Sequence, residues 1–156
     1  MLEQLLLTVL MTSVPLIFAA TGELVAERSG VLNLGVEGMM LMGAVAAFAT
    51  AFGTGNLWLA IIVGGLAGAL TGGVFALFAL GFATNQVATG LALTIFGTGL
   101  SGLVGAPLVG DDIDGLPQRT IPLRSNFAFV GVLLFSLDRR AYLAVALLAG
   151  VAWFLK

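Results

Sequence analysis

The chain carries no Asp, Glu, Lys or Arg over residues 38–110, an uncharged run of 73 residues. A helix on the surface of a soluble domain needs a polar outer face, which so long a run without charges does not supply. The hydrocarbon core of a bilayer is about 30 Å thick and is crossed by about 20 helical residues. The run therefore predicts three consecutive membrane-spanning helices joined by short, uncharged connections.

The composition of the whole chain excludes several classes of function. Of its 156 residues, 60% are hydrophobic and 9% are charged, against about 25% charged residues in an ordinary globular domain. Cysteine and histidine are absent, which excludes disulfides, Cys/His zinc sites, Ser-His-Asp triads and Cys-His pairs. We expect no catalytic residue, no metal site and no cofactor in this chain. Lys156 is the single lysine, and no G-x-x-x-x-G-K-[ST] loop is present to bind ATP. The net charge of −2 gives no indication of nucleic-acid binding.

We expect residues 1–156 to form a single transmembrane domain, an all-α polytopic helix bundle with about four to five spans. The expected spans are residues 4–22, 38–52, 57–82 and 87–109, with a short fifth at 141–155. Residues 29–37 are weakly apolar and punctuated by glycines, which is compatible with a discontinuous helix. The last span is short and the chain stops just after it, which we interpret as truncation of a longer protein.

Two of the expected spans carry small residues at intervals of four. They are Gly64, Gly68 and Gly72 in the third span and Gly97, Ser101 and Gly105 in the fourth. Residues four apart share one face of a helix, and small side chains there let two helix backbones approach closely in lipid. A glycine-lined pore is the functional alternative, and we favour helix–helix packing.

Polar residues at membrane depth are costly and often mark a transport pathway. The candidates for a substrate pathway are Asn33, Glu37, Asn85, Gln86, Thr89 and Thr94. Gln86 and Thr94 fall on one face of the fourth span, and Asn33 and Glu37 are four residues apart. Hydrogen bonding between helices is the structural alternative for the residues of the fourth span, and for Asn85 and Gln86 the two interpretations are equally balanced. For Glu37, at the start of the second span, the alternative is an interfacial charge. Thr98 and Ser101 are expected to bond back to their own helix.

Two segments in combination resemble a known family. They are ERSGVLNLGVEGMMLMGA at residues 27–44 and TNQVATGLALTIFGTGL at residues 84–100. Together they resemble the permease subunits of bacterial ATP-binding cassette (ABC) importers, in the group for simple sugars and nucleosides that is related to the ribose and branched-chain amino-acid permeases. The resemblance covers residues 5–156, and family members are about twice as long, so the chain resembles an N-terminal half.

The resemblance implies a multi-pass protein of the bacterial plasma (inner) membrane that conducts a small polar solute, a sugar or a nucleoside, and performs no catalysis itself. The implied partners are a second permease subunit in a homo- or heterodimer, cytoplasmic ATPase subunits, a periplasmic or lipid-anchored substrate-binding protein and the lipid bilayer. The alternatives are a small self-associating membrane channel or transporter, or a non-functional permease fragment. The distribution of arginines would place residues 110–140 in the cytoplasm. The family resemblance implies instead that these residues are periplasmic, so the orientation stays open.

Overall fold

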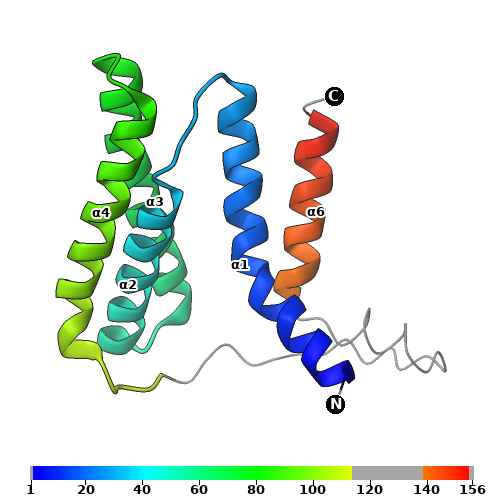
Figure 1. Ribbon diagram of the computed structural model, residues 1–156. Helices are drawn as coiled ribbons and strands as arrows, with labels where there is room; N and C mark the ends of the chain where they lie inside the picture. Colours follow the sequence, from blue (N-terminus) through cyan, green and yellow to red (C-terminus); the bar gives the residue numbers. More distant parts are fainter. Residues whose placement is uncertain (1, 114–138, 155–156) are drawn as a thin grey trace. The chain divides into compact units, whose positions relative to one another are not determined.

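A computed structural model describes residues 2–113 and 139–154, and these residues belong to two compact units (Figure 1). The first unit contains the N-terminal helix and the C-terminal helix, and the second contains described residues 29–113. All regular structure in these described residues is helical, which confirms the expected all-α fold class.

The first unit pairs α1 (Leu2–Arg28) with α6 (Arg139–Phe154). Their contact buries Val14 and Ala144, with Ile17 packed beside them. α1 extends beyond the expected span of residues 4–22 because nothing breaks the helix before the Ser29–Gly30 turn, where Gly30 has a φ of +81°. Pro15 lies inside α1 without ending it, as membrane helices often allow.

The second unit contains α2 (Val36–Thr54), α3 (Leu57–Ala76) and α4 (Gln86–Gly105). α3 continues as a π-helical turn, η1 (Leu77–Gly81), and α4 ends in a 3₁₀ turn, η2 (Ala106–Leu108). The expected third span thus changes its winding near its end.

Four helices in the described part of the chain are long and apolar enough to cross a membrane. They are Thr8–Arg28, Val36–Thr54, Leu57–Gly81 and Gln86–Leu108. The apolar helix Tyr142–Phe154, at the expected fifth span, is shorter. These lengths agree with the expectation of about four to five spans.

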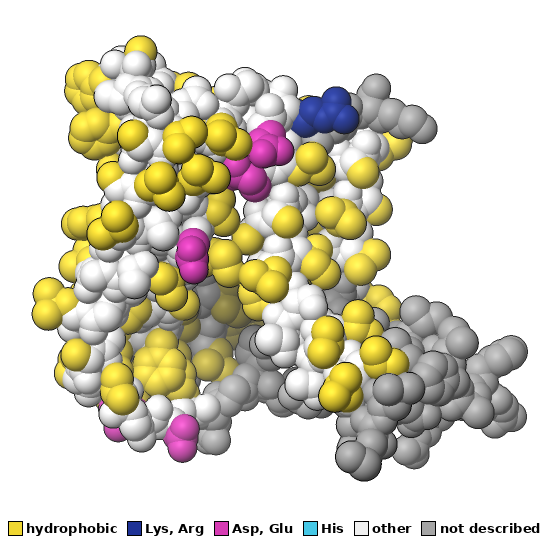
Figure 2. Space-filling model, viewed as in Figure 1, with side chains coloured by type: hydrophobic (Ala, Val, Ile, Leu, Met, Phe, Trp, Pro, Cys, Tyr) yellow, Lys and Arg dark blue, Asp and Glu magenta, His cyan; other side chains and the backbone are white. Residues whose placement is uncertain are grey.

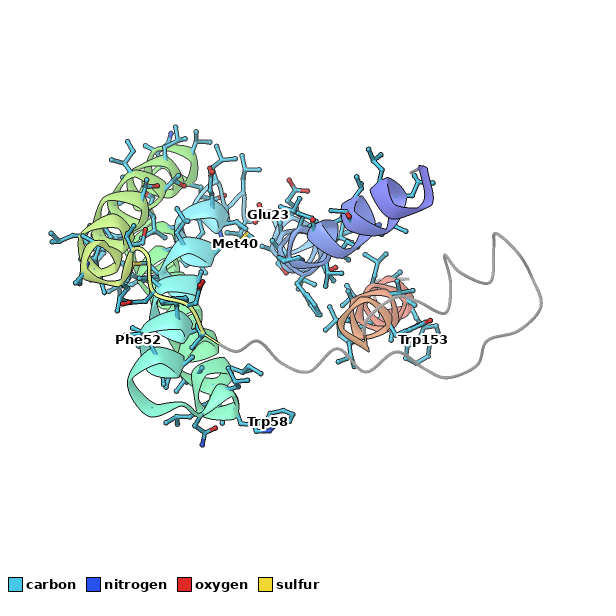
Figure 3. The ribbon with its side chains drawn as sticks, turned by 90° about the horizontal axis from the view of Figure 1, so that it is seen from below. Glu23, Met40, Phe52, Trp58 and Trp153 are labelled. Atoms are coloured by element: carbon cyan, nitrogen blue, oxygen red, sulfur yellow. The ribbon has the colours of Figure 1, made fainter. Side chains whose placement is uncertain are left out.

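A tight, capped turn connects α2 to α3. Gly55 ends α2 with a φ of +66°, and its N–H donates to the carbonyl of Ala51 at 2.8 Å. Asn56 then begins α3, because its Oδ1 accepts the N–H groups of Trp58 at 3.0 Å and Leu59 at 3.1 Å. Figure 3 shows the Trp58 ring projecting outward from this turn. An exposed indole at a helix start suits the interface between lipid and water.

α2 packs along both α3 and α4, whereas α3 meets α4 mainly near its end and at η1 (Figure 1). A buried cluster of Phe75, Ala79 and Leu93 joins η1 and the end of α3 to α4, and Val31 and Met39 pack against it. Most large apolar side chains point outward instead, and Figure 2 shows them spread over the visible helix surfaces. Ile95, for example, is 75% exposed. An apolar outer surface of this kind is what a lipid solvent requires.

Candidate functional site

Residues 29–35 are not helical and connect α1 to α2. They comprise a turn at Ser29–Gly30, three residues without regular structure and a second turn at Leu34–Gly35. The discontinuous helix expected near residues 29–37 corresponds to this interruption between two helices. Non-helical backbone leaves N–H and C=O groups that must find partners elsewhere.

Side chains of α4 bond to the backbone of this connection. Oε1 of Gln86 accepts the N–H of Leu32 at 2.8 Å, and Oγ1 of Thr94 donates to the carbonyl of Leu34 at 2.8 Å. Thr94 lies about 12 Å farther along the α4 axis than Gln86, at 1.5 Å per residue. The non-helical connection therefore follows α4 about a third of the way into its apolar span, Gln86–Leu108.

Glycines make this close approach sterically accessible. A Cβ added to Gly90 would lie 2.8 Å from the backbone N of Leu34, and one added to Gly97 would lie 2.6 Å from the Cα of Gly38. Real Cβ atoms essentially never come this near to backbone atoms. The sequence predicted Gly97 as a packing residue but missed Gly38 and Gly90 in that role. For Gly38 the signal was present as the repeated glycines of GVLNLGVEG at residues 30–38, and for Gly90 as its spacing of four from Gln86 and Thr94.

Asn33 and Glu37 lie at the start of α2. Oδ1 of Asn33 accepts the N–H of Gly35 at 2.9 Å, and its Nδ2 lies 3.6 Å from the sulfur of Met39. Glu37 is exposed in the first turn of α2, where the positive end of the helix dipole favours a carboxylate. Glu37 shares an exposed helix face with Leu41 and Ala44, so the carboxylate borders an apolar surface.

Asn85 and Thr89 hold the corner between η1 and α4. Asn85 is the N-cap of α4, because its Oδ1 accepts the N–H of Ala88 at 3.0 Å. The Thr89 hydroxyl lies 2.8 Å from the Asn85 carbonyl and 2.8 Å from the Thr84 hydroxyl. Thr84 in turn donates through its hydroxyl and its N–H to the carbonyl of Phe78. These bonds give Asn85 and Thr89 structural roles at this corner.

An apolar pocket of about 340 Å³ lies between α3, η1 and α4. Its lining consists of Val74, Phe75, Phe78, Ala92, Leu93 and Phe96, with Thr89 as the polar member. Three phenyl rings and a single hydroxyl suit an apolar or aromatic group. The pocket offers few partners for a solute that carries many hydroxyls.

In the row of glycines on α3, only Gly64 packs closely against a neighbouring helix. A Cβ on Gly64 would lie 2.8 Å from the Cβ of Ala47 and 2.9 Å from the carbonyl oxygen of Gly43, so α2 and α3 meet there. Cβ atoms on Gly68 and Gly72 would make ordinary contacts with Met39, at 3.8 and 3.7 Å.

In the row on α4, Gly97 lies nearest to α2. A Cβ on Gly105 would lie 3.4 Å from Val45 of α2. Ser101 donates to the carbonyl of Thr98 at 3.1 Å, and Thr98 donates to the carbonyl of Thr94 at 2.8 Å. Both hydroxyls bond back to their own helix, as expected.

Comparison with known proteins places the chain in a family. Residues 5–156 match the family model described as the permease component of the branched-chain amino acid transport system. The chain belongs to this permease family. As a member with several apolar helices of spanning length, it is a multi-pass membrane protein.

Curated relatives show the same relationship. The chain is 42% identical over 143 residues, 89% of its length and 43% of the relative's, to the putative glucose ABC transporter permease protein TsgC13 of Haloferax volcanii. It is 30% identical over 158 residues, 94% of its length and 49% of the relative's, to the guanosine ABC transporter permease protein NupQ of Bacillus subtilis. It is also 26% identical over 163 residues, 98% of its length and 51% of the relative's, to the nucleoside ABC transporter permease protein NupC of Lactococcus lactis. The chain thus spans about half the length of these relatives. No solved structure matches it.

Proposed function

We propose that residues 1–156 form a transmembrane permease domain of an ATP-driven importer for a small polar solute, a sugar or a nucleoside. The observation that carries this proposal is the family match over residues 5–156. The names of the relatives specify glucose, guanosine and nucleoside transport. Each of these solutes carries several hydroxyl groups. The chain supplies helices and polar groups along a path and does no covalent chemistry.

The proposed assembly contains a second permease subunit, ATPase subunits in the cytoplasm and a substrate-binding protein outside the plasma (inner) membrane. The sequence carries no G-x-x-x-x-G-K-[ST] loop, so ATP hydrolysis is assigned to another subunit. The relatives are named as permease proteins of ABC transporters, which supports the same division of labour.

We place the solute path beside the start of α2 and the first turns of α4, where Asn33 and Glu37 lie on one side and Gln86 and Thr94 on the other. Glu37 is the group there most suited to contact solute. It is exposed near the start of α2, and Gly38 next to it packs on Leu93 and Thr94, about a third of the way into the apolar span of α4. A carboxylate at such depth is costly in lipid and usually faces a bundle interior or a water-filled cavity. It also accepts strong hydrogen bonds from hydroxyls.

Uptake into proteoliposomes tests the transport function. The complete permease is reconstituted with its ATPase and binding protein, and accumulation of radiolabelled glucose and guanosine is measured with and without ATP. We expect accumulation of one solute class that requires ATP and every component. Passive flux through liposomes holding the permease alone would instead support a self-associating channel. ATP hydrolysis by the purified permease without partners would contradict the proposed division of labour.

Glu37→Gln tests the proposed path. We expect about three- to tenfold slower uptake at equal permease abundance, because a neutral amide accepts hydroxyl hydrogen bonds less strongly than a carboxylate. Asp112→Asn is the matched control, since it makes the same change at an exposed residue beyond η2. Equal uptake by both variants and the parent would remove Glu37 from the path.

A further inference from the structure

We propose that Gln86 and Thr94 are positioning residues that hold the non-helical connection on α4 and thereby fix the start of α2 and Glu37. They act through the backbone of residues 32–34 and do not contact the solute. This role rests on the proposed transport function, because it describes how the proposed path is kept in shape.

The connection needs partners that its own helices do not supply. Unpaired N–H and C=O groups cost several kcal/mol each in hydrocarbon, so irregular backbone persists at membrane depth only where protein or water satisfies it. The N–H of Leu32 is satisfied by Gln86 and the carbonyl of Leu34 by Thr94. Both partners are α4 side chains that lie more than 50 positions away in the sequence.

The two attachments share one face of α4, with a glycine between them. Gln86, Gly90 and Thr94 follow at intervals of four, which puts them along one side of the helix. Gly90 lets the connection lie directly on α4 between the two hydrogen bonds, because a Cβ at this position would meet the backbone of Leu34. Two side chains and one glycine of α4 therefore hold this non-helical stretch of backbone.

The same contacts determine where α2 begins. Leu34 is bonded to Thr94, and Gly38 packs on Leu93, Thr94 and Gly97. Releasing the connection from α4 would therefore free the first turn of α2, which carries Glu37. The hydroxyl proton of Thr94 is already donated to Leu34, so Thr94 cannot also donate to a solute hydroxyl in this arrangement.

Hydrogen–deuterium exchange tests the attachment without any transport. In nanodiscs, Gln86→Leu should speed exchange of the Leu32 amide about tenfold, the factor for a hydrogen bond of about 1.4 kcal/mol. Thr94→Val should speed exchange in the same segment, and Thr94→Ser, which keeps the hydroxyl, should restore the parent rate. Thr98→Val is the matched control, because Thr98 bonds its own helix, and it should leave the segment unchanged.

Competitive uptake then separates positioning from solute contact. In the reconstituted importer, Gln86→Leu and Thr94→Val should lower uptake of all accepted solutes by one common factor, so the ratio between two competing solutes stays at the parent value. Gln86→Glu keeps the hydrogen-bond acceptor and Thr94→Ser keeps the hydroxyl donor, so both variants should retain most of the parent's uptake.

Unchanged exchange of residues 31–35 in both Gln86→Leu and Thr94→Val would overturn the proposal. A changed solute ratio would also overturn it, because it would make these side chains solute contacts. If Gln86→Leu fails to fold, the comparison of Thr94→Val with Thr94→Ser decides. A parent that transports nothing would refute the proposed function, while the exchange result would still decide the attachment.

Discussion

The contact between α2 and α4 gives the sharpest prediction, because it depends on a single missing methyl group. Gly97→Ala would place a Cβ 2.6 Å from both the Cα and the carbonyl oxygen of Gly38. Ordinary van der Waals contact begins near 3.4 Å. The neighbouring atoms are backbone, so no rotamer change relieves the clash, and the two helices must separate.

Gly99→Ala provides the matched control on the same helix. Nothing lies within 4 Å of a Cβ built on Gly99. Both substitutions gain about 1 kcal/mol of helix propensity, so this gain cancels when the two variants are compared. The difference between their free energies of unfolding then isolates the steric cost. Overpacking costs about 1–3 kcal/mol, and the rigid backbone contact places Gly97→Ala at the upper end of this range.

Unfolding of the two variants in mixed micelles, with SDS raised stepwise and helicity followed by circular dichroism, measures this difference. We expect Gly99→Ala to match or slightly exceed the parent and Gly97→Ala to unfold at clearly lower SDS. Equal unfolding midpoints for the two variants would show that α2 and α4 do not touch through Gly38 and Gly97. The argument that places Glu37 at membrane depth would then lose its support.

Two further predictions concern stability in the same assay. Gly64→Ala should be less stable than Gly65→Ala, because a Cβ on Gly64 would meet Ala47 and Gly43. Nothing lies within 4 Å of a Cβ on Gly65. The reverse order of stability would contradict the α2–α3 contact. Asn56→Ala should lose about 0.5–2 kcal/mol through the lost N-cap, Asn56→Asp should retain it, and equal losses in both would refute a capping role.

The helical spans could be predicted from the sequence because their apolar runs are long. The expected second span of residues 38–52 corresponds to Val36–Thr54, and the expected fourth span of residues 87–109 to Gln86–Leu108. The change of winding at η1 could not be predicted, because its apolar residues continue the pattern of α3 without a break. In the structure the Phe82 N–H bonds the Leu77 carbonyl, and the hydroxyl and N–H of Thr84 bond the Phe78 carbonyl.

The sequence named candidate residues for the solute path, which stay a prediction, but it did not indicate which groups they bond. The sequence identified Gln86 and Thr94 as one polar face, and it left open whether such a face bonds solute or protein. The answer depends on what lies opposite, and Leu32 and Leu34 present only backbone groups there. Apolar residue types give no sign that their backbone needs outside partners, so no local pattern could pair them with α4.

The packing glycines and the polar residues of α4 act on the same stretch of backbone. A non-helical stretch reaches membrane depth only if its polar groups are satisfied and if no bulky side chain keeps it away from its partner helix. Gly90 and Gly97 remove the bulk, while Gln86 and Thr94 supply the hydrogen bonds. The two features support each other, because a Cβ at Gly90 would meet the backbone of Leu34 and push it away from Thr94. The proposed path for solute therefore depends on α4 for its shape, whereas Glu37 of α2 supplies the proposed contact with solute.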